Sequence, residues 1–156
     1  MMEQTKKSYT FEEIKQKLVN YCVYQDRCHD EVERKMREFL LIPEAKDEII
    51  LFLIKENYLN EERFVRSYIR GKFNIKKWGR IKIRMHLKQK GISDKLILKC
   101  MDEIDEDQYL EAIKIIWNNY YLKHKALKDW QKRSKTISYL ISRGYEYELV
   151  KDIYRL

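Results

Sequence analysis

The near absence of chain-breaking residues is the feature that most restricts how this sequence can fold. Four glycines and one proline occur in 156 residues, whereas average usage would give about 11 and about 8. Sandwiches and barrels need turn residues between many short strands, and phosphate-binding loops need closely spaced glycines. The apolar residues recur instead at spacings of three and four. The sequence therefore predicts an all-α protein and excludes a glycine-rich nucleotide-binding loop.

Capping residues and breakers divide the chain into nine predicted helices. These cover residues 11–24, 27–40, 44–57, 61–72, 78–90, 94–104, 105–121, 128–142 and 147–154. Thr10, Asp26, Asn60 and Ser93 are the expected N-caps of the first, second, fourth and sixth helices. The third helix is apolar nearly all round and the fifth is apolar on two sides, so we expect the third to be buried and the fifth to be sandwiched between neighbours. The expected core positions include Ile50, Leu53, Phe64, Tyr68, Leu87, Ile97, Leu140 and Val150.

The helices fall into three sets of three, with a period of about 50 residues. Residues Arg80–Gly91 align without gaps with Arg133–Gly144: a basic residue, a leucine seven positions later and a glycine eleven positions later recur in both. A three-helix unit is too small to be very stable alone, so such units must pack in series. We expect a flexible tail at residues 1–9 and three tandem three-helix repeats, 10–58, 59–104 and 105–156, in an elongated, curved array.

The basic charge is concentrated in the middle of the chain. Residues 63–101 contain 13 Lys and Arg against one acid, Asp94, which gives a net charge of +12 within a chain of net charge +8. Helices usually mix signs to gain ion pairs between successive turns. A polyanionic partner, either nucleic acid or an acidic protein groove, is one explanation, and a merely solvated basic face is the other. The acids at positions 102–107 begin a helix, where the dipole favours them, and they could also pair with the basic segment.

Three arginines form a stripe on the fourth helix. Arg63, Arg66 and Arg70 fall opposite the apolar residues at positions 64, 65, 68 and 69. We therefore expect them to be exposed and dispensable for folding. The predicted binding face joins them to the other basic residues of the middle segment and to two on the eighth helix. It comprises Arg63, Arg66, Arg70, Lys72, Lys76, Lys77, Arg80, Lys82, Arg84, Lys88, Lys90, Lys132 and Arg133.

No constellation of catalytic or metal-binding residues is recognisable. Cys22, Cys28 and His29 lack a zinc spacing and a fourth ligand, and neighbouring Cys28 and His29 point apart on a helix. We expect no enzyme activity, cofactor or metal. The longest apolar run, Ile49–Ile54, is far shorter than the roughly 20 residues that span a bilayer. Without a visible secretory signal, and with three cysteines but no CxxC pair, the sequence predicts a cytoplasmic protein.

Three segments together resemble the RecX family of bacterial regulatory proteins. They are Leu59–Tyr68, Trp78–Ile83 and Leu87–Ile92. They contain an asparagine followed by acids, an Arg-Phe pair, a glycine before a basic helix, and a Lys-Gly-Ile end, as the middle repeat of that family does. The first unit resembles the family's opening repeat over Arg27–Met36, and the third resembles its closing repeat over Leu140–Tyr145.

The resemblance implies a non-enzymatic regulator in recombination, DNA repair and the SOS response. Such a protein lies along the groove of the filament that the RecA recombinase forms on single-stranded DNA, and it suppresses the ATPase, strand-exchange and co-protease activities of RecA. We expect a monomer, with contact to double-stranded DNA as a further option. The residues themselves leave two other functions open: a general DNA- or RNA-binding protein that needs no RecA, and a helical adaptor for an acidic protein surface.

Overall fold

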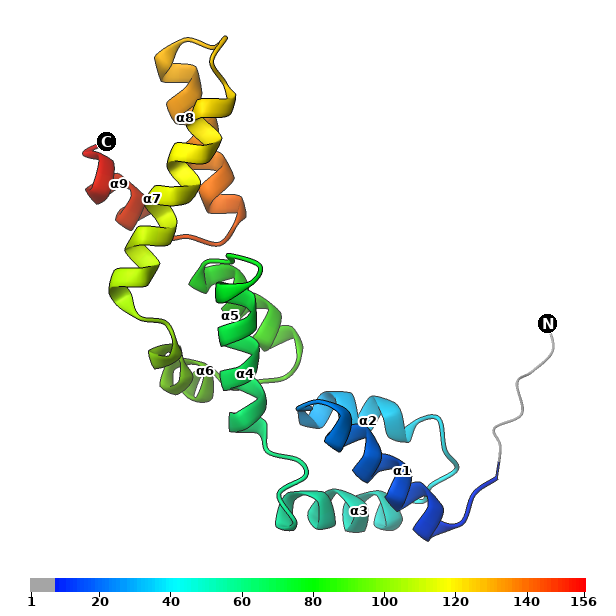
Figure 1. The fold of residues 1–156 in the computed structure, drawn as a ribbon. Coiled ribbons are helices and arrows are strands. Elements are labelled where there is room, and N and C mark those ends of the chain that lie inside the picture. Colours follow the sequence, from blue (N-terminus) through cyan, green and yellow to red (C-terminus); the bar gives the residue numbers. More distant parts are fainter. Residues whose placement is uncertain (1–7) are drawn as a thin grey trace, which may run out of the picture. The chain divides into compact units, whose positions relative to one another are not determined.

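The computed structural model describes residues 8–156, and this part of the chain is helical throughout, without a strand (Figure 1). The expected tail at residues 1–9 lies mostly outside the described residues. The elements are α1 (Phe11–Tyr24), α2 (His29–Met36), α3 (Pro43–Lys55), α4 (Glu61–Asn74), α5 (Arg80–Gln89), α6 (Asp94–Cys100), the 3-10 turn η1 (Met101–Glu103), α7 (Glu106–Lys123), α8 (Asp129–Ser142) and α9 (Tyr147–Tyr154). The chain divides into two compact units, one ending at Ser67 and the other covering Tyr68–Leu156. The all-α prediction is confirmed.

The first unit packs α1 against both α2 and α3. Thr10 caps α1 as predicted, in a capping box in which its hydroxyl accepts a bond from the Glu13 amide. Pro43 occupies the first turn of α3, where its missing N–H costs nothing. The core of this unit consists of Ile14, Leu18, Val19, Cys22, Val32, Met36, Phe39, Ile49, Leu53 and Leu59.

Two predictions for the first unit are wrong. The second helix begins at His29 and ends at Met36, and its N-cap is Cys28 rather than Asp26. The third helix is not buried: Leu51 is 67% exposed and Ile54 is 42% exposed. Because α3 packs on α1 from one side, Leu51 and Ile54 on its other side stay open to solvent, while Ile50 lies at the edge of the core. Ile50 is accordingly half-buried.

The second unit places α7 beside α8, with α9 packed on α8 and α6 packed on α5. Ser93 caps α6 as predicted, because its hydroxyl accepts a bond from the Leu96 amide, and Asp105 caps α7 in the same way. The side chains buried in this unit are Ile69, Phe73, Ile83, Leu87, Ile92, Ile97, Cys100, Ile104, Tyr109, Ala112, Ile113, Trp117, Thr136, Leu140, Tyr145 and Val150.

Helix α5 buries only one of its two apolar faces. Ile83 and Leu87 are fully buried, but Ile81 is 54% exposed and Met85 is 51% exposed. The prediction of a sandwiched helix is therefore wrong, since apolar spacing reveals a face without revealing whether a neighbour covers it. Of the expected core positions, Leu53, Phe64, Leu87, Ile97, Leu140 and Val150 are buried, whereas Ile50 and Tyr68 are half-buried.

The turn before α5 meets the turn before α9 backbone to backbone. The Gly79 amide donates to the Arg143 carbonyl at 2.7 Å, and the Ile81 amide donates to the Gly144 carbonyl at 3.0 Å. A Cβ on Gly79 would lie 2.3 Å from the Gly144 carbonyl carbon and oxygen. Only glycine allows this approach, so the crossing fixes the start of α5 against the end of α8 within the second unit.

Candidate functional site

The first arginine of the predicted stripe is a structural residue of the first unit. Arg63 Nε donates to Asp26 Oδ1 at 2.7 Å, and its terminal nitrogen donates to the carbonyls of Asn57 and Tyr58 at 3.0 and 3.1 Å. The other Asp26 oxygen accepts a bond from the Ser67 hydroxyl at 2.9 Å. Arg63 is thus half-buried, and the expectation that it is exposed is wrong. Its contacts lead us to expect that it contributes to the fold. Asp26 is unavailable as a helix cap because α4 uses its carboxylate.

The other two stripe arginines also have acidic partners. Arg66 binds Glu62 Oε1 at 3.1 Å, one turn earlier on α4. Arg70 binds Glu103 Oε2 at 3.0 Å, and Glu103 lies on η1. Arg66 is half-buried, while the Arg70 side chain is 49% exposed. Glu103 belongs to the acidic segment at positions 102–107, and so does Glu106, which binds Arg80. This acidic segment therefore does pair with basic residues of positions 63–101.

On α5, the basic side chains of one face form ion pairs with carboxylates. Arg80 lies 2.7 Å from Glu106 and 4.0 Å from Glu146. Arg84 and Lys88 both bind the single acid Asp94, at 3.0 and 3.3 Å. Hydrogen bonds from these two cations lower the pKa of Asp94. The carboxylate therefore stays ionised below the usual carboxyl range, and one negative charge faces two positive ones.

The buried Tyr109 of α7 connects the start of α5 to the turn before α9. The Tyr109 hydroxyl accepts a bond from the Arg80 amide at 3.1 Å and donates to Glu146 Oε1 at 2.7 Å. Burial raises the pKa of Tyr109, so the phenol stays protonated and can donate. Neither Tyr109 nor Glu146 was predicted, because α5, α7 and the turn before α9 meet only in the folded chain.

Lysines without carboxylate partners gather around Trp78. Lys72 Nζ lies 4.8 Å and Lys82 Nζ 4.6 Å from the centre of the Trp78 ring, and the His86 ring lies 4.6 Å from it. Within residues 8–156, no acid pairs with Lys72 or Lys82. We call Lys72, Trp78, Lys82 and His86 the lysine–tryptophan cluster. Desolvation, followed by the charges of Lys82, Lys72 and Lys90, lowers the pKa of His86.

The turn beside this cluster adds two exposed lysines, Lys76 and Lys77. Their backbone is anchored, since the Lys77 carbonyl accepts a bond from the Tyr145 hydroxyl at 2.9 Å and the Lys76 carbonyl accepts one from the Arg143 guanidinium. Lys77 also adopts a left-handed conformation, with a φ of 57°. The ammonium groups therefore extend from a fixed turn, and anions can reach them without reordering the backbone.

The basic residues of α8 stand apart from this cluster in their contacts. Lys132 and Arg133 are half-buried, and Lys132 Nζ lies 5.2 Å from the Tyr121 ring centre. The nearby aromatic rings stack on one another: Tyr120 stacks on Tyr139 at 4.2 Å, and Trp117 stacks on Tyr154 at 3.9 Å. Ring faces used in this way serve packing rather than base stacking.

Further findings concern the cysteines, metal binding and membrane insertion. All three cysteines are buried free thiols, and Cys28 Sγ lies 3.4 Å from Glu31 Oε1. Across residues 8–156, no three His, Cys, Asp or Glu side chains gather as a metal site would require. In the same part of the chain, no helix has the length and apolar character to cross a membrane.

Comparison with known proteins identifies the architecture. Residues 60–101 match the second three-helix domain of RecX, and residues 106–153 match its third three-helix domain. The crystal structure of RecX from Lactobacillus salivarius superposes with a TM-score of 0.85 at 23% identity, covering 93% of this chain and 94% of that one. A second crystal structure of regulatory protein RecX gives a TM-score of 0.83 at 20% identity, over 94% of this chain and 73% of that one.

Relatives in sequence carry the same description. The "Regulatory protein RecX" of Streptococcus uberis is 33% identical over 97% of this chain, and that of Clostridium perfringens is 34% identical over 68% of it. The chain spans only part of these relatives, 58% and 50% of their lengths. Two successive domain matches, the shared fold and these relatives agree with the motifs at Leu59–Tyr68 and Leu87–Ile92. The chain belongs to the RecX family of regulatory proteins.

Proposed function

We propose that this protein binds the filament that RecA forms on single-stranded DNA and lowers the ATPase, strand-exchange and co-protease activities of RecA. It acts in the cytoplasm as a monomeric binding protein, without a catalytic group or cofactor. Membership of the RecX family supports the choice of RecA as partner. The observation that carries the nucleic-acid part is the lysine–tryptophan cluster, whose cations have no carboxylate partner in the described chain.

The cluster suits phosphate groups better than the arginine stripe does. Arg63, Arg66 and Arg70 already bind carboxylates, so a phosphate would have to displace an internal partner. Lys72 and Lys82, with Lys76 and Lys77 from the adjoining turn, need no such exchange. If these four lysines each neutralise one phosphate of a single strand, the logarithm of the binding constant falls against the logarithm of salt concentration with a slope of about −2.8.

A charge-reversal pair tests this proposal. Lys72→Glu with Lys82→Glu is expected to flatten the salt dependence on labelled oligothymidylate and to weaken inhibition of the RecA ATPase. The matched control is Lys95→Glu with Lys114→Glu, which changes the charge equally at two exposed lysines of the same unit. Equal behaviour of the two pairs would reject the cluster as the contact site.

The wild-type protein separates the three candidate functions. Inhibition of the RecA ATPase together with salt-dependent DNA binding supports the proposal. DNA binding with no effect on RecA would indicate a general nucleic-acid-binding protein. Inhibition of RecA without measurable DNA binding would indicate an adaptor for a protein surface.

A further inference from the structure

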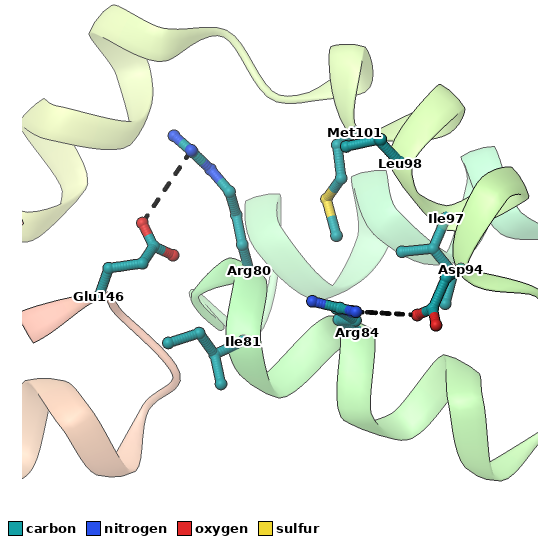
Figure 2. A pocket seen from close by; sticks show the side chains of 8 residues that line it. All are labelled: Arg80, Ile81, Arg84, Asp94, Ile97, Leu98, Met101 and Glu146. Carbon is teal, nitrogen blue, oxygen red and sulfur yellow. Dashed lines mark hydrogen bonds and ion pairs between the residues drawn. The ribbon is translucent and has the colours of Figure 1, made fainter.

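A groove lined largely by apolar side chains lies between α5, α6 and the residue that precedes α9 (Figure 2). Its cavity measures about 370 Å³, which falls in the range of small binding sites. Ile81 contributes from α5, Leu98 from α6 and Met101 from η1. Ile81 is 54% exposed and Leu98 is 77% exposed. The groove therefore presents a contiguous set of apolar side chains to solvent, and contiguous exposed apolar surface is typical of interaction sites.

The apolar surface continues along α5. A second hollow shares Ile81 and Arg84 with the groove and adds Met85, which is 51% exposed. Ile81 and Met85 are one turn apart and lie on the same side of α5. Lys82 and His86 of the lysine–tryptophan cluster lie roughly 100° away around the helix axis. One helix thus has an apolar face and a separate cationic face.

The polar groups of the groove differ at its two ends. At one end, Arg84 and Lys88 share the single carboxylate of Asp94, which leaves positive charge in excess. At the other end, Glu146 Oε2 is buried and accepts no hydrogen bond from any described residue, with Arg80 4.0 Å away. Figure 2 shows Arg80 and Glu146 on one side of the groove and Arg84 and Asp94 on the other. A matching ligand would carry a carboxylate at the first end.

These properties fit a protein segment better than a nucleic-acid strand. A phosphodiester backbone has no apolar group for Ile81 and Leu98. We propose that the groove docks an amphipathic segment of the partner protein. One apolar side chain of that segment fills the cavity, and a neighbouring carboxylate binds Arg84 and Lys88. Identifying the partner as the RecA filament rests on the proposed function.

The second unit would then use different surfaces for the two components of the filament. The lysine–tryptophan cluster contacts phosphate, and the groove contacts protein. This division predicts that binding to DNA and binding to the filament can be lost separately. Neither surface alone would give the full affinity, because the two contacts act together on one filament.

The test measures wild-type and variant binding to labelled oligothymidylate alone and to RecA filaments assembled on it with a non-hydrolysable ATP analogue. Ile81→Gln with Leu98→Gln is expected to weaken filament binding at least tenfold and to change binding to naked DNA less than twofold. The matched control is Leu122→Gln with Ile141→Gln, two exposed apolar residues outside the groove, 61% and 47% exposed, for which both affinities should stay at the wild-type value. Asp94→Asn provides a second test, because freeing Arg84 and Lys88 for the partner's carboxylate should strengthen filament binding while leaving DNA binding within twofold.

The outcomes separate the groove from the proposed function. If the groove variant binds filaments as the wild type does, or if Asp94→Asn weakens filament binding, the groove proposal is wrong and the proposed function stands. If the wild type itself does not bind filaments, the proposed function fails first. A wild-type dimer that the groove variant converts to a monomer would show that the occupant is a second copy of this chain, and it would overturn the proposal.

Discussion

Among alanine substitutions at the glycines of the second unit, we expect Gly79→Ala and Gly144→Ala to be the two most destabilising. The new Cβ would lie 2.3 Å from the Gly144 carbonyl carbon and oxygen and 2.4 Å from the Tyr145 amide nitrogen. All three are backbone atoms, so no side-chain rotation can relieve the overlap. The turn before α9 must move away, which breaks the bonds from Gly79 to Arg143 and from Ile81 to Gly144.

The size of the effect follows from these contacts. Two lost backbone hydrogen bonds cost about 2 kcal/mol together, and overpacking of a fixed backbone adds about 1–3 kcal/mol. The free energy of unfolding should therefore fall by about 3–5 kcal/mol, a large part of the total for a small domain. Gly144→Ala should cost at least as much, because Gly144 has a φ of 97° and its Cβ would lie 2.4 Å from Lys82 Cβ.

The two remaining glycines are internal controls. Gly71 lies inside α4 with nothing within 4 Å of an added Cβ, so Gly71→Ala should stabilise the unit by about 0.5–1 kcal/mol. Gly91 has equally open space but a φ of 79°, so Gly91→Ala should cost about 1–2 kcal/mol from backbone strain alone. This pair separates the cost of strain from the cost of the backbone crossing.

Urea unfolding followed by tryptophan emission measures this series. All three tryptophans, Trp78, Trp117 and Trp130, belong to the second unit, so the signal reports that unit alone. Midpoints should fall in the order Gly71→Ala, Gly91→Ala, Gly79→Ala. A Gly79→Ala variant as stable as Gly71→Ala would refute the close crossing of the two turns.

Three further predictions follow from the contacts described. Arg63→Ala should lower the free energy of unfolding of the first unit by about 1–3 kcal/mol, because it leaves the half-buried Asp26 carboxylate without its charged partner. In thermal melts, the double variant with Asp26→Ala should lose less stability than the sum of the two single variants. Burial raises the pKa of Tyr145 to about 12, above the value of 10 in the unfolded chain, so the unfolded state loses its proton first. The neutral phenol therefore contributes its full share to the free energy of unfolding below pH 10. That share is lost as the pH rises from 10 to 12, by at most about 2.7 kcal/mol. Tyr145→Phe should remove that part of the alkaline destabilisation, which phenolate absorbance and unfolding curves can follow together. Desolvation and then the charges of Lys82, Lys72 and Lys90 lower the pKa of His86, and phosphates bound at these lysines should raise it by offsetting the second contribution. NMR titration of the His86 ring protons measures this, and an unchanged pKa at saturating DNA would place the strand elsewhere.

Features set by neighbours in sequence were predictable. The caps at Thr10, Asn60 and Ser93 form within their own helices, and each hydroxyl or amide oxygen accepts the bond that the spacing predicts. The last helix has the predicted bounds, Tyr147–Tyr154, because Gly144 ends the preceding helix with a positive φ. These elements depend on local hydrogen bonds and on backbone conformations that distant residues do not alter.

Features set by distant residues were not predictable from local patterns. Asp26 has the spacing of a cap, but Arg63 and Ser67 bind its carboxylate from 37 and 41 positions away. The exposed faces of α3 and α5 carry apolar residues that periodicity alone assigns to the core. Periodicity identifies which residues share a face, whereas burial also requires a neighbour to cover that face.

The same distinction explains why net charge is a poor guide to the binding site. A count of +12 over residues 63–101 treats arginine and lysine alike. In the folded chain the arginines at positions 63, 66, 70, 80 and 84 all bind carboxylates, several of them supplied from outside that segment. A planar guanidinium with five donors binds carboxylates and phosphates alike, so the difference here is that these guanidinium groups are already occupied. Lys72 and Lys82 are held over Trp78 by cation–π contact, which positions their charge without neutralising it. These arginines therefore already have partners within the fold, and Lys72 and Lys82 are the cations through which we propose that a polyanion binds.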